Sequence, residues 1–262
     1  MGDNILEARG VSISFGGVQA VKDVSFEVPR GVIFGIIGPN GAGKTTLLNG
    51  ISGLVPLSAG HIEFEGQRIS GTKKPHQIAR LGIGRTFQVA RPFDGLTVRE
   101  NIAVGAVFAG KVGGRKHAEV WSLVDEVMEF VGNADKQDSL VPDLPVAQRK
   151  RVELGRAVAI RPKLLLLDEV MAGLNQREVE SVMEMVRRIR DRGTTIILIE
   201  HIMKAVMGLC DTVMVLRSGQ RICVGTPSMV CADDQVIAAY LGDRYAKRKA
   251  DIGELEQGHA QS

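Results

Sequence analysis

The stretch Gly38-Pro39-Asn40-Gly41-Ala42-Gly43-Lys44-Thr45 decides the fold that we expect for this chain. It has the spacing G-x-x-x-x-G-K-T, and it follows an apolar run, 32–37, that is typical of a strand buried on both faces of a parallel sheet. Residues 46–51 are typical of a helix. Glycines let successive N–H groups point into one concavity, where they and the beginning of the helix bind phosphate oxygens. The stretch therefore predicts a loop that binds the β- and γ-phosphates of a nucleotide.

The side chains of this loop have separate predicted roles. Lys44 places a positive charge on the phosphate oxygens, and the hydroxyl of Thr45 is a ligand for Mg²⁺. A glycine-rich turn that matches the pattern by chance is the alternative, but the strand before the loop and the helix after it argue against chance. The nucleotide-binding residues predicted for the loop are Gly38, Pro39, Asn40, Gly41, Ala42, Gly43, Lys44, Thr45 and Thr46.

A second part of the same site is predicted at the end of the leucine run 164–167. Asp168 and Glu169 follow this run, so their carboxylates lie at the carboxyl end of a buried strand, within reach of a metal ion held by the phosphate loop. We expect Asp168 to bind Mg²⁺ and Glu169 to act as the general base that polarises the attacking water. The alternative is that both carboxylates only cap the segment that follows.

Three further side chains are candidates on position alone. His201 follows the strand-like run 194–199 and Glu200, so its imidazole can hydrogen-bond the γ-phosphate or the water in catalysis. Gln88 ends the β-rich first part of the chain, where its amide can contact Mg²⁺ or the water. Phe15 offers a flat apolar face to the adenine ring, although a phenylalanine packed in the core fits its position equally well.

The order of patterns along the chain indicates a divided domain and a tail. Alternating apolar residues over 5–28 predict a small antiparallel sheet, and residues 89–161 have the periodicity of an inserted helical subdomain. Strands alternating with helices over 162–243 indicate a parallel sheet. We expect an α/β fold of the RecA-like P-loop NTPase class, with an ATP-binding core in 1–88 and 162–243 and a mobile tail in 244–262.

Composition narrows the class of protein. The 262 residues, 44% of them hydrophobic, can form a substantial core without disulfides. With 33 Lys and Arg against 30 Asp and Glu the net charge is only +3, so we expect no nucleic-acid partner. No apolar run reaches the ~18 residues of a membrane span, and neither a secretion signal nor a C-x-x-C pair is visible. These features favour a protein of the reducing cytoplasm.

Five motifs resemble, in their order, those of the ATP-binding subunits of ABC transporters. The stretch from Gly38 to Thr45 is similar to the Walker A motif, Gln88 to the Q-loop and 164–169 to the Walker B motif. Ala172-Gly173-Leu174-Asn175 resembles the D-loop, and His201 resembles the switch histidine. The resemblance implies that the chain hydrolyses ATP with Mg²⁺ to power solute import.

Other stretches resemble the subgroup that takes up branched-chain amino acids. They are Phe15-Gly16-Gly17, 149–154, 168–174 and the ending Ala239-Tyr240-Leu241-Gly242, and the whole resemblance covers 4–243. The resemblance also implies a peripheral position at the cytoplasmic face of the inner membrane. The implied partners are a second ATP-binding subunit, identical or different, transmembrane permease subunits and, indirectly, a periplasmic solute-binding protein.

The family signature Leu-Ser-Gly-Gly-Gln aligns with Leu144-Pro145-Val146-Ala147-Gln148 and is altered here. In the family, the serine hydroxyl and the glycine amides bind the γ-phosphate of the ATP that the partner subunit holds. Pro145 has no hydroxyl, and the side chains of Val146 and Ala147 hinder close approach of the backbone. Ala147 and Gln148 stay candidates for nucleotide binding, because N–H groups of 148–150 are expected to point outward from a helix over 148–160. We expect slower hydrolysis at a site that uses this signature.

Two other classes of protein stay open at this point. One is a soluble ABC ATPase that remodels protein or nucleic-acid complexes, although such proteins often contain duplicate ATPase domains or long coiled coils, which this chain lacks. The other is a small-molecule kinase or GTPase, but the chain has no Asn-Lys-x-Asp sequence for guanine. For an importer, amides or urea are the alternative solutes.

Overall fold

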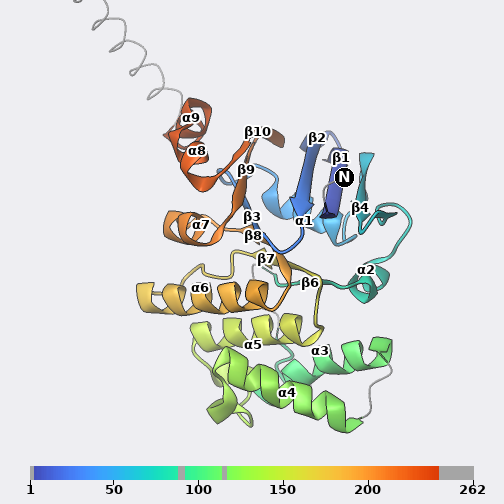
Figure 1. Ribbon diagram of the computed structural model, residues 1–262, viewed down its shortest axis with the longest axis vertical. Helices are drawn as coiled ribbons and strands as arrows, with labels where there is room; N and C mark the ends of the chain where they lie inside the picture. Colours follow the sequence, from blue (N-terminus) through green and yellow to red (C-terminus); the bar gives the residue numbers. More distant parts are fainter. Residues whose placement is uncertain (1–2, 88–91, 114–116, 242–262) are drawn as a thin grey trace, which may run out of the picture.

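The computed structural model describes residues 3–87, 92–113 and 117–241 (Figure 1). A mixed sheet lies at the centre, with an antiparallel sheet packed toward one of its faces and helices packed toward the other. Gln88, predicted as a catalytic and Mg²⁺-binding residue, lies outside the described ranges, and so does the predicted tail 244–262.

The strands of the described ranges form two sheets. Their bounds are β1 (Asn4–Phe15), β2 (Val18–Pro29), β3 (Ile33–Ile37), β4 (Ala59–Phe64), β5 (Gln67–Arg68), β6 (Ile83–Arg85), β7 (Leu164–Asp168), β8 (Thr195–Ile199), β9 (Thr212–Arg217) and β10 (Gln220–Gly225). The central sheet has the order β10-β9-β3-β8-β7-β6, and all its neighbours are parallel except β10 and β9. The antiparallel sheet has the order β2-β1-β4-β5.

Nine α-helices lie within the described ranges. They are α1 (Lys44–Ile51), α2 (Pro75–Leu81), α3 (Val98–Gly113), α4 (His117–Val131), α5 (Val146–Ala159), α6 (Gln176–Asp191), α7 (Met203–Leu209), α8 (Pro227–Ala232) and α9 (Asp234–Leu241), with short 3₁₀ turns at Ala134–Lys136 and Val141–Asp143. Figure 1 shows α3, α4 and α5 as one group, with α6 between this group and the central strands. In the part of the chain that the structure describes, every helix is too short or too polar to cross a bilayer.

The central strands divide their side chains between two cores. In β7, Leu165 and Leu167 pack in a core with the helices, whereas Leu164 and Leu166 pack in a core with α1 and the antiparallel sheet. All four side chains are buried. Successive residues of a strand point to opposite faces, so a strand covered on both faces needs a continuous apolar run. The leucine run is therefore a strand of the sheet centre.

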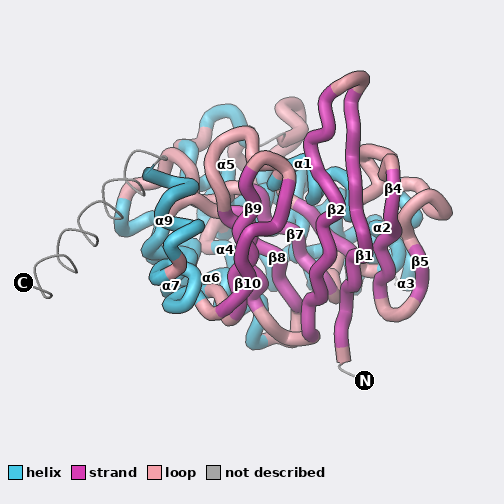
Figure 2. The backbone as a smooth tube through the Cα atoms, turned by 90° about the horizontal axis from the view of Figure 1, so that it is seen from above, coloured by secondary structure: helices cyan, strands magenta, loops and turns pink. Residues whose placement is uncertain are grey.

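The antiparallel sheet is dominated by the long hairpin of β1 and β2, which projects at one side of the molecule in Figure 2. Its inward residues, among them Val11, Ile13 and Val21, are buried in the core that also contains α1. This packing brings the hairpin next to the phosphate loop, because α1 begins where that loop ends.

The predicted fold class is confirmed, since a parallel sheet and an N-terminal antiparallel sheet are both present. The limits predicted for the subdomains, at 88 and 162, stay predictions. The strand β10 was not predicted. It forms because Ser218 and Gly219 both adopt positive φ angles, 49° and 81°, which suit a tight hairpin turn after β9. Ser218 and Gly219 indicate this turn only weakly, because serine rarely adopts positive φ.

Candidate functional site

Residues predicted from the phosphate loop and from the end of the leucine run meet at the carboxyl ends of the parallel strands. A hollow of about 540 Å³ lies there. Open α/β sheets bind ligands at this edge. The hollow is lined by Ala20, Asn40, Gly41, Ala42, Gly43, Lys44, Thr45, Thr46, Glu169 and His201. Of these residues only Ala20, from β2, was not predicted.

Glycine is required at two bends of the phosphate loop. Gly38 has a φ of +151°, and a Cβ there would lie 2.1 Å from the carbonyl oxygen of Leu216. Gly43 has a φ of +98°, and a Cβ there would lie 2.5 Å from the carbonyl oxygen of Ala20. Any larger residue would push the loop away from β9 or β2. Helix α1 then begins without a side-chain cap, so its first N–H groups are directed toward the loop.

The ammonium group of Lys44 lies inside the loop. Its Nζ donates hydrogen bonds to the carbonyl oxygens of Gly38 and Pro39, at 2.8 and 3.1 Å. Burial lowers the pKa of Lys44, and the nearby carboxylates of Glu169 and Asp168 raise it. The loop thus holds the ammonium group of Lys44 against its concave side. There the charge can contact an anion that enters the hollow.

Beside the loop, Thr45, Asp168 and Arg85 form a buried polar chain. The hydroxyl of Thr45 donates to Oδ1 of Asp168 at 3.3 Å, and Nη2 of Arg85 lies 3.3 Å from Oδ2. The side chains of Arg85 and Asp168 are only 7% and 1% exposed. Burial raises the pKa of Asp168, while Arg85 and then the Thr45 hydroxyl oppose this rise. Arg85 therefore helps to keep Asp168 ionised.

Glu169 is fixed through its backbone. Its φ is +49°, a conformation that costs a non-glycine residue about 1–3 kcal/mol. Its N–H donates to the carbonyl oxygen of Ile199 at 3.0 Å, and its carbonyl oxygen accepts from Nζ of Lys150 on α5 at 3.1 Å. Oε2 of Glu169 lies 4.0 Å from Nδ1 of His201. The two side chains predicted to act on the water therefore face the same hollow.

The predicted residues Ala147 and Gln148 lie apart from this hollow, in the first turn of α5. The helix begins at Val146 rather than near Gln148, because Pro145, in an extended conformation, is its N-cap. The N–H of Arg149 donates to the carbonyl oxygen of Pro145 at 3.0 Å. The expectation that N–H groups of 148–150 point outward therefore fails for Arg149 and Lys150, since the groups left over by the helix are those of Val146, Ala147 and Gln148.

Phe15 lies at the end of β1 with 50% of its surface exposed, and it does not line the hollow. Packing in the core is therefore excluded for this side chain. Contact with an adenine ring stays a prediction.

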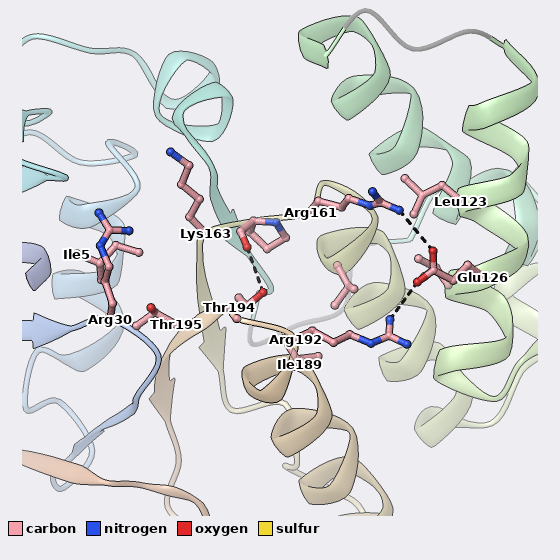
Figure 3. Close-up of a pocket in the computed structure, with 14 residues that line it drawn as sticks. Ile5, Arg30, Leu123, Glu126, Arg161, Lys163, Ile189, Arg192, Thr194 and Thr195 are labelled. Atoms are coloured by element: carbon pink, nitrogen blue, oxygen red, sulfur yellow. Dashed lines mark hydrogen bonds and ion pairs between the residues drawn. The ribbon is translucent and has the colours of Figure 1, made fainter. Parts of the chain in front are cut away.

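A second hollow, of about 440 Å³, lies near the amino ends of β7 and β8 (Figure 3). Figure 3 shows Arg161 and Arg192 pointing toward Glu126 on α4, with ion-pair distances of 3.4 and 3.2 Å. These ion pairs connect α4 to the two segments that precede β7 and β8. None of the predicted site residues lines this second hollow. The candidate site is therefore the hollow at the phosphate loop.

Sequence reasoning missed the charged residues that support the site. Oε1 of Glu153 accepts from the N–H of Phe87 at 2.7 Å, and Oε1 of Glu200 accepts from the N–H of Met171 at 2.9 Å. Burial raises the pKa of both carboxyl groups. They hold the backbone just before Gln88 and just after Glu169. The sequence offers one signal for these two residues, because each glutamate directly follows an apolar residue.

Comparison with known proteins decides the family. Residues 21–172 match the family described as ABC transporter, a range that covers more than half of the chain and includes the phosphate loop and Glu169. The chain belongs to the ABC transporter family. Residues 220–246 of this cassette also match the family described as branched-chain amino acid ATP-binding cassette transporter.

Curated relatives of this ATP-binding cassette have similar lengths. BraF of Pseudomonas aeruginosa is 34% identical over 251 residues, which cover 91% of this chain and 98% of the relative. LivG of Escherichia coli is 35% identical over 255 residues, which cover 93% of this chain and 100% of the relative. Both relatives are named as high-affinity branched-chain amino acid transport ATP-binding proteins.

Solved structures of ATP-binding cassettes have the same fold. One cassette of an ABC transporter superimposes with a TM-score of 0.83 at 30% identity, covering 91% of this chain and 99% of the other. Another, in its ADP conformation, has a TM-score of 0.79 at 30% identity, covering 92% and 99%. The expected family is thereby confirmed, and this cassette is a nucleotide-binding ATPase subunit of an ABC transporter.

Proposed function

We propose that this cassette binds ATP together with Mg²⁺ and hydrolyses it to power the import of branched-chain amino acids. The observation that supports the proposal best is the convergence of Lys44, Thr45, Glu169 and His201 around one hollow. Asp168 lies beside it, bonded to the hydroxyl of Thr45. The backbone of the loop from Gly38 to Thr46 surrounds the phosphates in this proposal, and Phe15 contacts the adenine ring.

The oxygen atoms of Thr45 and Asp168 suit Mg²⁺. They lie 3.3 Å apart beside the phosphate loop, and both are the hard oxygen ligands that this ion prefers. Mg²⁺ is usually bound by one or two carboxylates together with phosphate oxygens, and it keeps several of its waters. When bound, it neutralises charge on the β- and γ-phosphates. Thr45 and Asp168 would hold it here, and Gln88 is the third proposed ligand.

Hydrolysis in this proposal depends on positioning and on charge. Glu169 takes a proton from the attacking water. The backbone contacts of Glu169 with β8 and α5 hold its carboxylate in position for this step. His201, next to Glu169, hydrogen-bonds the γ-phosphate or the water, and Gln88 contributes to the same step. Lys44 neutralises charge on the phosphate oxygens. Phosphoryl transfer to water needs such positioning rather than a covalent intermediate.

The proposed partners complete the site and the transport pathway. A second ATP-binding subunit, identical or different, packs head to tail with this one, so that the first turn of α5 with Ala147 and Gln148 faces the partner's ATP. Transmembrane permease subunits carry the solute, and a periplasmic binding protein delivers it. The cassette then lies at the cytoplasmic face of the inner membrane as a peripheral subunit.

Reconstitution tests both the transporter role and the solute. The chain is co-expressed with the permease and ATPase genes identified beside its own gene by inspecting the gene neighbourhood, and the purified complex is placed in lipid vesicles. We expect leucine-loaded binding protein to stimulate ATP hydrolysis, and Glu169→Gln to abolish the stimulation. Stimulation by urea or an amide but not by leucine would overturn the solute. Failure to associate with any permease would favour a soluble ABC ATPase instead.

A further inference from the structure

Lys150 connects α5 to the end of β7. It lies in the second turn of the helix and is half-buried, and its Nζ donates a hydrogen bond to the carbonyl oxygen of Glu169 at 3.1 Å. Figure 1 shows α5 grouped with α3 and α4, whereas Glu169 directly follows β7 of the central sheet. The bond therefore joins the group of helices to the residue that is proposed as the base.

The backbone of Glu169 is held on both sides of its Cα. Its N–H donates to the carbonyl oxygen of Ile199 at 3.0 Å, and its carbonyl oxygen accepts from Lys150 and, at 3.2 Å, from the N–H of Ala172. Peptide groups are planar, so fixing the two that flank a residue fixes its φ, its ψ and the direction of its Cβ. These contacts therefore set the direction in which the side chain of Glu169 leaves the backbone.

The two bonds at this carbonyl oxygen differ in what they fix. Ala172 is three residues after Glu169, so its N–H closes a local turn and moves with that segment. Lys150 belongs to another element, so its bond fixes the turn relative to α5. The φ of +49° at Glu169 persists in a non-glycine residue only where the surroundings hold it. Loss of the bond from Lys150 would therefore let the turn, and the carboxylate with it, change direction.

The charge of Lys150 also matters for this contact. Burial lowers the pKa of Lys150, and the carboxylates of Glu200, Glu153 and Glu169 raise it. Glu153 and Glu200 are themselves fixed, because each accepts a hydrogen bond from a backbone N–H, at 2.7 and 2.9 Å. Their charge favours the ammonium form in this half-buried position. A charged donor bonds a carbonyl oxygen more strongly than a neutral one does.

We propose that Lys150 is a positioning residue of the hydrolysis reaction: by holding the carbonyl oxygen of Glu169, its ammonium group sets the direction in which the Glu169 carboxylate faces the hollow. The inference rests on the proposed function, because it requires Glu169 to be the base. It also means that the base is positioned from α5, the helix whose first turn is proposed to face the partner's ATP.

Lys150→Met tests the ammonium group, since it keeps the apolar stem. In the assembled ATPase pair we expect kcat to fall about tenfold, the effect of one hydrogen bond to a charged group. KM and the dissociation constant of the full-length chain for Mg-ATP should stay close to the parent's, because the loop that binds the phosphates is unchanged. Lys150→Arg keeps a charged donor and should recover most of kcat. Parent-like kcat in Lys150→Met would overturn the inference.

A double variant separates positioning of the base from a general effect on the fold. If Lys150 acts through Glu169, Lys150→Met should cause no further loss of the residual single-turnover rate in a Glu169→Gln background. An equal fractional loss in both backgrounds would overturn the inference, because the lysine would then act independently of the base. If Lys150→Met does not fold, as judged by its melting temperature, the neutral Lys150→Gln takes its place in both comparisons.

Two controls complete the experiment. Lys163→Met is the matched control, because this lysine pairs with Glu65 and lines the second hollow at the amino end of β7, and it should hydrolyse Mg-ATP like the parent. Glu169→Gln alone tests the proposed function. If Glu169→Gln loses turnover while Lys150→Met keeps it, only this inference is overturned. If Glu169→Gln hydrolyses Mg-ATP like the parent, the proposed base fails and the inference with it.

Discussion

The beginnings of α1 and α5 are two helix N-termini that are built differently. Neither has a side-chain cap or an acidic residue in its first turn, so both present unpaired N–H groups and a positive dipole end. Before α1, glycines with positive φ bend the backbone around a hollow and enclose Lys44. Before α5, Pro145 is extended, and the first turn consists of Val146, Ala147 and Gln148.

Because of this difference, we expect α1 to determine nucleotide binding and α5 to limit the rate of hydrolysis. In the proposed function, the beginning of α1 holds the triphosphate with groups of a single subunit. The beginning of α5 is proposed to act on a nucleotide held by a partner, and it lacks the serine hydroxyl and the glycines of the family signature. We therefore expect a cassette that binds Mg-ATP normally and hydrolyses it slowly wherever this α5 completes the site.

The largest effect is expected at Glu169. Glu169→Gln preserves size and the backbone contacts but removes the proposed base, so turnover should fall by about 10²-fold or more. Mg-ATP affinity should stay close to that of the parent, because Lys44 and Thr45 are unchanged. Phosphate release and calorimetry measure the two quantities. Glu180→Gln, at an exposed position of α6, is the matched control. Undiminished hydrolysis would reject Glu169 as the base.

Restoring the family signature tests whether the beginning of α5 limits hydrolysis. Replacing Pro145, Val146 and Ala147 by Ser, Gly and Gly adds a hydroxyl donor and lets the backbone approach a phosphate closely. We expect turnover of the assembled ATPase pair to rise roughly tenfold, the effect of one hydrogen bond to a charged group. Pro145→Ser alone should give part of the gain. Turnover equal to the parent's in the triple variant would show that the altered signature does not limit hydrolysis.

A smaller, pH-dependent effect is expected at Arg85. The guanidinium opposes the rise that burial causes in the pKa of Asp168, so Arg85→Gln raises that pKa further. Because only the carboxylate binds Mg²⁺, Mg-ATP turnover should then be lost at a higher pH as the solution is acidified. Loss of one partner of this buried pair should also lower the free energy of unfolding by about 3 kcal/mol.

Arg85→Lys is the control for this experiment, because it keeps the charge beside Asp168 but cannot bond Ser52 and Asp168 in the same fork. The pH at which Arg85→Lys loses turnover on acidification should lie between the values for the parent and for Arg85→Gln. Identical pH profiles for all three proteins would contradict the account of how Asp168 stays ionised.

The parts of the fold and site that could be predicted are those encoded by neighbouring residues. The spacing from Gly38 to Thr45 specifies the loop because its positive-φ bends need glycine at fixed positions. The leucine run specifies a central strand because burial on both faces excludes polar residues. Asp168, Glu169 and His201 could be placed because each lies within two residues of the end of such a run.

The remaining features depend on contacts between distant segments. Arg85 and Asp168 are 83 residues apart, and no local pattern pairs them. The same holds for Lys150, which reaches the carbonyl of Glu169 from α5. The beginning of α5 was misplaced because Pro145 starts the helix without a polar cap, whereas sequence rules look for Ser, Thr, Asp or Asn.

Calorimetric titration of the full-length chain with Mg-ATP tests the central claim, that the phosphate loop and Asp168 together hold a triphosphate with its metal ion. The account predicts saturable binding for the parent, binding that is weakened at least about tenfold by Lys44→Ala, and weaker binding when Mg²⁺ is replaced by a chelator. No heat of association with the parent, or equal affinity for the parent and Lys44→Ala, would contradict it.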